Sequence, residues 1–239
     1  MAHFIRGKDR IFQSSAALRF PPLDPKQTAV VVVDMINWQV TRGKGMLGPM
    51  EKEGIPVDYI VERVNKTVVP NLQHLFAVCR ETGAKIVYLR AGCFQPDFSD
   101  SIGPFREIMR ETGAVEGSWA CEVIDPLRPE PGDVSLLKTG SGGFGTSNLD
   151  IHLRNMGIKN VLYTGVITNG CVLLSLATGF DLGYHGYLVS DTTATFSQRW
   201  QDLTEEIVSV YMAKVVTTAQ IVDELRGAQP ERRILAAAG

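Results

Sequence analysis

The chain has 239 residues, 44% of them hydrophobic, and its 24 Lys and Arg against 26 Asp and Glu give a formal net charge of −2. Such a balance leaves no basic excess for nucleic acid, and the length suits one large α/β domain or two small ones. The N-terminus lacks a signal-peptide core and no apolar run approaches the ~20 residues of a membrane span, so we expect a cytoplasmic protein without a nucleic-acid or membrane partner.

Strand-like and helix-like segments alternate from residue 28 to residue 225. Residues 1–27 hold several prolines and little periodicity, which indicates an extended N-terminal arm, and residues 226–239 form a tail. Apolar, β-branched runs predict buried strands at 28–34, 85–90, 134–138, 160–165, 186–191 and 214–217. Apolar spacing and terminal glycines predict helices around 72–79, ending before Gly83, and over 148–156, 172–182, 198–213 and 218–225.

This order predicts a single domain over 28–225. Alternating strands and helices without an internal repeat indicate a three-layer α/β/α sandwich whose central sheet is mostly parallel. Residues 91–133 interrupt the alternation with five prolines and little periodicity. We expect this insert to form irregular lid or interface loops rather than a second domain.

Three reactive side chains follow strands of the expected sheet. Asp34 closes the first strand, Lys138 closes the third, and Cys171 lies just past the fourth, at the start of a helix. Ligand sites of open α/β sheets lie beyond the carboxyl ends of the strands, so the three should share one rim. Each alone has an ordinary explanation, as a cap, a solvated lysine or a buried small side chain. Together they favour thiol chemistry, because a helix N-terminus and a cation lower a thiol pKa.

The segment GSGGFG, 140–145, matches the glycine pattern of a dinucleotide-binding loop. That motif requires an acid about 20 residues later, at the end of the next strand, and residues 151–180 contain no Asp or Glu. An NAD-binding oxidoreductase is therefore a weak alternative, and we expect no cofactor. The glycines instead suggest that the backbone and Phe144 approach a small-molecule substrate closely.

The sequence indicates neither a metal site nor disulfide bonds. The four histidines are scattered, and none joins acids at ligand spacing on the expected rim, so we expect no metal site. The four cysteines are widely spaced without a CxxC pair, which indicates free thiols. No histidine follows a strand, which also disfavours a Cys-His pair.

Three separated motifs, VVVVDMIN at 30–37, LLKTGSGGF at 136–144 and YTGVITNGCV at 163–172, resemble those of the isochorismatase-like cysteine hydrolases. The resemblance runs from about residue 28 to residue 225 and is closest to amidohydrolases of ureido compounds, such as ureidoacrylate, biuret, triuret and N-carbamoylsarcosine. It implies an α/β/α fold, a homo-oligomer (dimer or tetramer) and hydrolysis of a C–N bond of a small ureide or amide. Members that cleave isochorismate lack the cysteine.

The resemblance implies roles for particular residues. Asp34, Lys138 and Cys171 correspond to a catalytic triad, in which the thiolate attacks a carbonyl and Asp34 serves as base and then as acid. It also implies a cis peptide between Val166 and Ile167 and an oxyanion hole built from the N–H groups of Ile167 and Cys171. The covalent intermediate would release ammonia or an amine before water frees the enzyme.

Five residues beside the triad are candidates for substrate binding: Asn37, Trp38, Arg90, Phe144 and Asn169. Trp38 and Phe144 could equally pack within loops, and Arg90 could bind a carboxylate or stay solvated. The chain departs from the resemblance at Ile36, where many relatives have Gln. The segment AGCFQPD, which follows the second strand, lacks the Asp-x-His pattern of nicotinamidases, which disfavours their metal site and substrate.

Two other functions stay open at this point. The chain could be a catalytically silent α/β protein that binds a ligand in the same pocket. It could also be an isochorismatase-like hydrolase that acts on a different amide or on a hydrazide. Reactivity of Cys171 distinguishes an enzyme from a silent scaffold, and a substrate screen distinguishes the hydrolases from one another.

Overall fold

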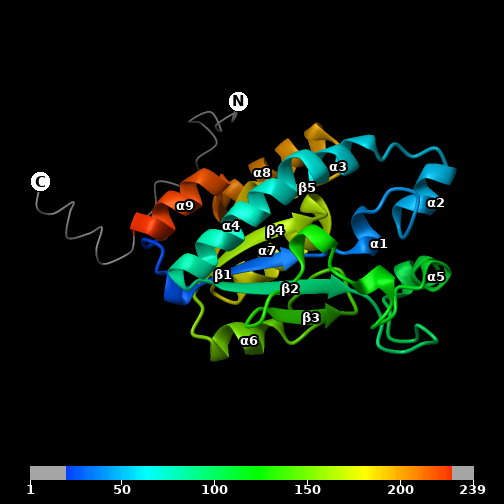
Figure 1. Cartoon of the computed structure of the whole chain (residues 1–239), viewed down its shortest axis with the longest axis horizontal. Coiled ribbons are helices and arrows are strands. Elements are labelled where there is room, and N and C mark those ends of the chain that lie inside the picture. The colour runs from blue at the N-terminus through cyan, green and yellow to red at the C-terminus, as the bar shows by residue number, and fades with distance from the viewer. Residues whose placement is uncertain (1–19, 228–239) are drawn as a thin grey trace, which may run out of the picture.

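The computed structural model describes residues 20–227, with a six-stranded sheet at the centre (Figure 1). The strand order is β3-β2-β1-β4-β5-β6, and all neighbouring strands are parallel. The strands are β1 (Thr28–Val33), β2 (Lys85–Ala91), β3 (Val134–Lys138), β4 (Asn160–Val166), β5 (His185–Ala194) and β6 (Ala213–Val216). All six lie within three residues of the predicted ends, so the predicted strands and their parallel arrangement are confirmed.

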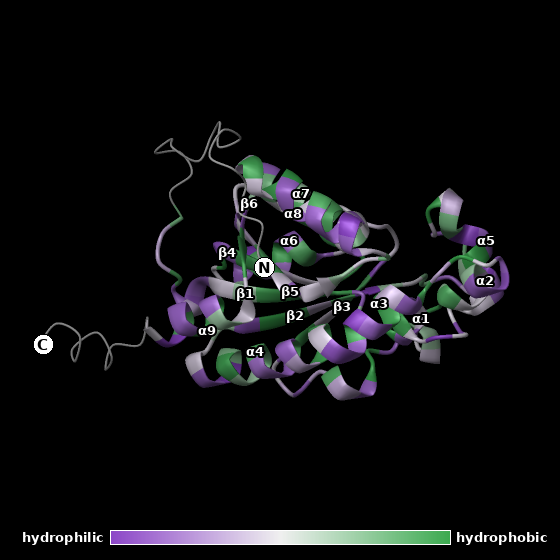
Figure 2. Cartoon of the chain, turned by 90° about the horizontal axis from the view of Figure 1, so that it is seen from above, coloured by the Kyte–Doolittle hydropathy of each residue, from purple (hydrophilic) through white to green (hydrophobic). Residues whose placement is uncertain are grey.

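Helices cover both faces of the sheet (Figure 2). One layer consists of α3 (Asp58–Arg63), α4 (Val69–Thr82) and α9 (Thr218–Gly227), and the other of α6 (Leu149–Asn155), α7 (Leu173–Asp181) and α8 (Gln198–Tyr211). In β1, Val30 and Val32 belong to one buried cluster, whereas Val31 and Val33 belong to the other. Both faces of the strand are buried, as its continuous apolar run predicted.

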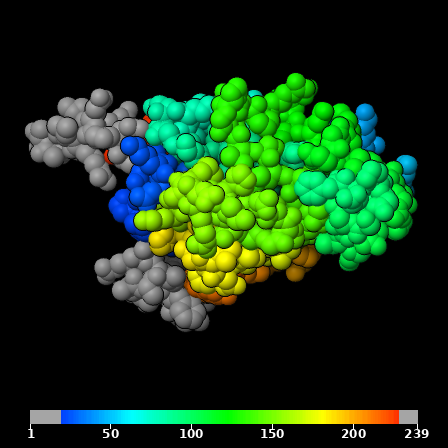
Figure 3. All heavy atoms as spheres, turned by 90° about the horizontal axis from the view of Figure 1, so that it is seen from below, coloured from blue at the N-terminus to red at the C-terminus, as the bar shows by residue number. Residues whose placement is uncertain are grey.

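The insert at 91–133 differs from the expectation of irregular loops. It contains α5 (Gly103–Thr112) and two 3-10 turns, Trp119–Cys121 and Asp125–Leu127. Pro104 in the first turn of α5 and Gly113 at φ 71° are helix boundary signals, and Phe105, Ile108 and Met109 fall at helical spacing, although only Met109 is buried. In the space-filling view this insert lies at the end of the molecule opposite the first described residues (Figure 3).

Further short helices were also absent from the sequence prediction. They are α1 (Asn37–Val40) and α2 (Leu47–Lys52), both after β1, and α3. A turn of π-helix, Val64–Val68, joins α3 to α4, so the helical run begins well before the predicted one. Pro70 follows this π-helical turn within the continuous helical run, and its missing N–H and its ring interrupt regular α-helical bonding there.

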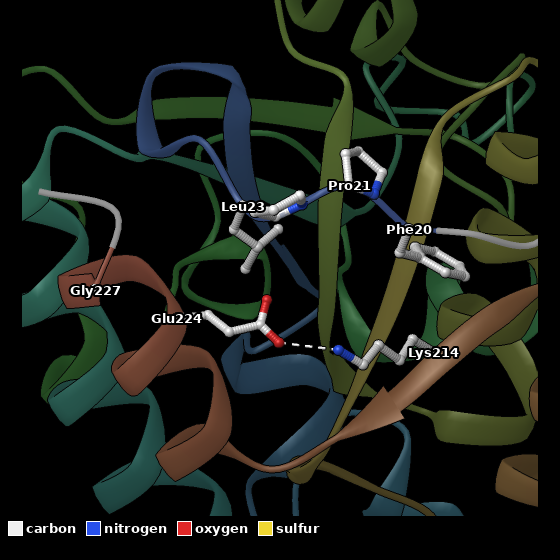
Figure 4. A pocket seen from close by; sticks show the side chains of 7 residues that line it. Phe20, Pro21, Leu23, Lys214, Glu224 and Gly227 are labelled. Atoms are coloured by element: carbon white, nitrogen blue, oxygen red, sulfur yellow. Dashed lines mark hydrogen bonds and ion pairs between the residues drawn. The ribbon is translucent and has the colours of Figure 1, made fainter. Parts of the chain in front are cut away.

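Part of the expected N-terminal arm packs on the domain. Leu23 is buried, and residues 25–27 form a 3-10 turn that leads into β1. Phe20, Pro21 and Leu23 line a small hollow beside the ion pair of Lys214 with Glu224 (Figure 4). Residues 1–19 and 228–239, which hold the rest of the arm and nearly all of the tail, lie outside the described residues. Within residues 20–227 no helix combines the length and apolar character that a membrane span requires.

Strands β1 and β4 lie in close contact at Val33 and Gly165, directly before Asp34. Gly165 pairs with Val33 and has a φ of 91°. A Cβ atom built on Gly165 would lie 2.0 Å from the carbonyl oxygen of Val33. A side chain here would therefore clash with backbone and occupy the left-handed region that favours glycine.

We expect Gly165→Ala to lower the free energy of unfolding by about 3 kcal/mol or more, because the strained φ and the clash act together. Gly103→Ala is the matched control, since its Cβ would meet no atom within 4 Å, and it should change stability by less than about 0.5 kcal/mol. Urea denaturation of both variants measures the difference. Equal stabilities would contradict this account of the β1–β4 contact.

Candidate active site

The three side chains of the predicted triad lie at the carboxyl ends of β1, β3 and β4. Lys138 is the last residue of β3, Asp34 follows β1, and Cys171 follows β4 after a short loop. Asp34 has a φ of 50°, and its N–H donates to the carbonyl of Leu89 at 2.8 Å. A non-glycine residue in the left-handed region is uncommon and is often found at functional sites, where the surrounding structure enforces it.

Asp34 and Lys138 form a fully buried ion pair. Lys138 Nζ lies 2.9 Å from Asp34 Oδ2, and neither side chain is exposed to solvent. Lys138 also donates to the carbonyl oxygen of Gly140 at 2.9 Å, and Asp34 Oδ1 accepts from the N–H of Ala91 at 2.8 Å. Such a pair is stable only when further hydrogen bonds compensate for lost hydration, and these contacts supply them.

Cys171 completes the cluster and is its most accessible member. The thiol interacts electrostatically with both Asp34 and Lys138. It lies in the helical turn Thr168–Val172, directly before α7, and is partly exposed. The other three cysteines are buried. Cys171 is therefore the residue of the three that solvent can reach, whereas Asp34 and Lys138 are fully buried.

Burial and the net effect of the charges around the thiol act against the lowered thiol pKa that the sequence suggested. Burial and the carboxylate of Asp34 raise the pKa of the Cys171 thiol to about 12, against an opposing effect of Lys138. Burial also raises the pKa of Asp34, although Lys138 acts in the other direction. Burial lowers the pKa of Lys138, but the neighbouring Asp34 and Cys171 outweigh it, so that pKa is raised. The ion-pair geometry of Asp34 and Lys138, together with the raised thiol pKa, describes a resting cluster of a carboxylate, an ammonium and a protonated thiol.

The loop between β4 and Cys171 is fixed by neighbouring elements. The peptide bond between Val166 and Ile167 is cis, as the resemblance implied. Thr168 donates its hydroxyl to Gln201 Oε1 at 2.8 Å, and Asn169 Oδ1 accepts from the Thr195 hydroxyl at 2.6 Å. The predicted oxyanion hole of Ile167 and Cys171 N–H groups lies on this loop and stays a prediction.

Two of the expected substrate-binding residues lie in the core. Trp38 is 2% exposed and donates its indole N–H to the hydroxyl of Thr112. Phe144 is 5% exposed and stacks on Tyr184, with ring centroids 5.6 Å apart. The structure therefore places both in packing positions, the alternative that the sequence left open, instead of at an open substrate pocket.

Two polar side chains predicted to bind substrate instead bond to other residues of the same chain. Arg90 binds the carboxylate of Glu116 through two nitrogens, at 3.0 and 3.2 Å, which corrects the idea of an Arg90 open to a substrate carboxylate. Asn37 donates its side-chain amide to the carbonyl of Trp119 at 2.9 Å. Trp119 is exposed, and Lys44 Nζ lies 4.9 Å from its ring centre.

The GSGGFG segment has a packing role. A Cβ atom on Gly143 would lie 2.4 Å from Leu89, and the N–H of Gly143 donates to Ser175 in α7. Ser175 in turn donates to the carbonyl of Cys171 at 2.7 Å. The glycines thus let the loop lie close to β2 and to the helix that begins beside the thiol.

Sequence reasoning missed Gln39, which donates Nε2 to Asp34 Oδ2 at 3.1 Å. Its signal was a second amide, after Asn37, in the otherwise apolar stretch that follows the acid. In the described part of the chain, no group of three or more His, Cys, Asp or Glu side chains is placed to hold a metal ion.

Comparisons with known proteins show the family to which the chain is similar. The family model of the isochorismatase domain matches residues 28–220. The ureidoacrylate amidohydrolase RutB of Caulobacter segnis is 30% identical over 187 residues, 72% of this chain and 74% of that protein. The corresponding protein of Agrobacterium fabrum is 31% identical over 186 residues, 72% of this chain and 77% of its own length.

Solved structures show the same fold. A cysteine hydrolase from Pseudomonas syringae pv. phaseolicola 1448A superposes with a TM-score of 0.75 at 23% identity, over 89% of this chain and 98% of that one. The N-carbamoylsarcosine amidase of Thermoplasma acidophilum superposes with a TM-score of 0.61 at 27% identity, over 80% of this chain and 96% of that one.

The charges of the cluster predict opposite effects on thiol alkylation. Iodoacetamide should modify Cys171 before the three buried cysteines. Asp34→Asn removes the neighbouring negative charge and should speed alkylation near neutral pH, whereas Lys138→Met removes the positive charge and should slow it. Each pKa unit of displacement changes the thiolate fraction about tenfold.

Labelling rates at several pH values, read by peptide mass spectrometry, measure these effects. Circular dichroism of each variant controls for loss of fold. Changes of the same sign in both variants, or none in either, would show that the two charges do not act on the thiol.

Proposed function

This chain belongs to the isochorismatase family and, like the relatives it matches, is an enzyme that hydrolyses carbon–nitrogen bonds other than peptide bonds, and we propose that it does so through Cys171. We infer that its substrate is a small ureido or amide compound of the ureidoacrylate, biuret, triuret or N-carbamoyl type. The observation that supports this most is the buried Asp34–Lys138 ion pair in contact with a partly exposed thiol.

The first step forms a covalent intermediate. As Cys171 Sγ attacks the substrate carbonyl carbon, its proton passes to the carboxylate of Asp34, and the carbonyl π electrons move to oxygen. The raised thiol pKa favours transfer of the proton during the attack rather than before it. The N–H groups of Ile167 and Cys171 receive the oxyanion in this proposal.

The second step expels the leaving group. The oxyanion collapses, the C–N bond breaks, and Asp34 gives its proton to the departing nitrogen, so that ammonia or an amine leaves. Lys138 keeps its proton throughout, because the neighbouring Asp34 and Cys171 raise its pKa. The product of this step is an acyl or carbamoyl thioester of Cys171.

Water completes the cycle. Asp34 takes a proton from water while the oxygen attacks the thioester carbon, the S–C bond breaks, and the sulfur recovers the proton from Asp34. One carboxylate therefore acts as base, acid, base and acid in succession. Ile36 offers no hydrogen bond at the position where many relatives have Gln, which favours a substrate that needs none there.

A screen for ammonia or amine release identifies the substrate and tests the nucleophile. Ureidoacrylate, biuret, triuret, N-carbamoyl amino acids, simple amides and hydrazides form the panel. Cys171→Ser should lower kcat by at least about 10³-fold, because the serine hydroxyl is far less acidic than the thiol. A serine variant that retains a rate within tenfold of the parent would exclude Cys171 as nucleophile.

The acid side of the pH profile reports on Asp34. Burial raises the pKa of Asp34 above the ordinary 3.8, and only the ionised carboxylate can accept the thiol proton. Activity should be full above this raised pKa and fall as the pH drops through it, so kcat/KM should decline at a pH above 3.8. An unchanged kcat/KM down to that pH, with the enzyme still folded, would contradict the role of Asp34.

A further inference from the structure

Gln39 is a buried amide that contacts the proposed base. It lies in the short helix α1, is 3% exposed, and donates Nε2 to Asp34 Oδ2 at 3.1 Å. A carboxylate accepts hydrogen bonds and cannot donate them, so the amide nitrogen must face Asp34 while that residue is ionised.

The contacts of Asp34 are distributed unevenly over its two oxygens. Oδ2 accepts from Lys138 Nζ at 2.9 Å and from Gln39 Nε2 at 3.1 Å, which occupies both of its lone pairs. Oδ1 accepts from the N–H of Ala91 at 2.8 Å and keeps its second lone pair. The thiol of Cys171 is the further side chain that interacts with this carboxylate.

We propose that Gln39 is a positioning residue which, together with Lys138, occupies Asp34 Oδ2 and so directs the thiol proton to Oδ1. This inference rests on the function proposed above. The proton leaves Cys171 Sγ for the open lone pair of Oδ1, and from there it passes to the leaving nitrogen. Gln39 takes part in no bond making or breaking.

The other atom of the amide argues against a purely structural role. Gln39 Oε1 is buried and has no hydrogen-bond partner among the described residues. An unpaired buried acceptor destabilises the folded state, and a methionine of similar length would fill the space without that penalty. Packing alone therefore does not account for an amide at this position, whereas its donor contact with Asp34 does.

The backbone around Gln39 is fixed from both sides. The N–H of Asn37 donates to the carbonyl of Glu122 at 2.9 Å, and the carbonyl of Trp38 accepts from the N–H of Met46 at 2.8 Å. These bonds tie α1 to the insert on one side and to the segment before α2 on the other. The amide thus reaches Asp34 from a firmly held turn.

Hydrogen bonds to a carboxylate stabilise its ionised form. Without Gln39, Oδ2 would have a free lone pair and the pKa of Asp34 would rise further. The enzyme would then lose its base at a higher pH than the parent does. A loss of packing would instead lower the rate by the same factor at every pH.

Gln39→Met tests the proposal on the full chain. The amide disappears while length and volume are nearly kept. We expect kcat/KM to fall on the order of tenfold on the acid side of the profile, because a hydrogen bond to a charged group is lost, and the deficit to shrink as the pH rises. The melting temperature should not fall, since the unpaired Oε1 is removed with the amide.

Gln73→Met is the matched control, because Gln73 lies exposed on α4 and bonds the carbonyl of Pro126, far along the chain from the site. It should leave the profile unchanged. If Gln39→Met folds poorly, Gln39→Asn provides the same test, since it withdraws the amide by one methylene and should displace the acid side in the same direction.

An acid side displaced to higher pH in the Gln39 variant, with the Gln73 variant equal to the parent, supports the proposal. A deficit that is constant over the whole pH range overturns it. Full activity of Asp34→Asn is a separate result, because it refutes Asp34 as the base and therefore the proposed function itself.

Discussion

The ion pair between Asp34 and Lys138 is the constraint on which the site depends. Both charges are removed from water, which is costly unless each is held by further hydrogen bonds. The carbonyl of Gly140, the N–H of Ala91 and the amide of Gln39 provide those bonds. The pair is therefore maintained by groups from β2, from the loop after β3 and from α1, and Cys171 rests against it.

The protonated thiol follows from this arrangement. A helix N-terminus and a lysine would by themselves promote a thiolate, but burial and the adjacent carboxylate act more strongly. A protonated thiol is a weak nucleophile until it loses its proton. In the proposed mechanism Asp34, the base, already lies beside Cys171, the nucleophile, so little reorganisation remains for the chemical step.

The sequence was sufficient to predict the sheet and the three clustered residues. The strand runs are continuous and apolar, and the ends of parallel strands meet at one edge, so Asp34, Lys138 and Cys171 could be placed together without a structure. Helix α5 was missed because the five prolines of the insert at 91–133 suggested irregular loops. The contacts of Trp38 and Arg90 could not be predicted, because their partners Thr112 and Glu116 are distant in sequence and no local pattern indicates them.

Infrared difference spectroscopy at neutral pH tests the resting charge distribution most directly. Subtracting the spectrum of Cys171→Ser from that of the parent isolates the S–H stretch of one cysteine, and subtracting that of Asp34→Asn isolates the carboxyl group. We expect an S–H band from Cys171 together with an ionised carboxylate band from Asp34. A missing S–H band together with the band of a protonated carboxyl would mean that the thiol proton already resides on Asp34, which would contradict the account.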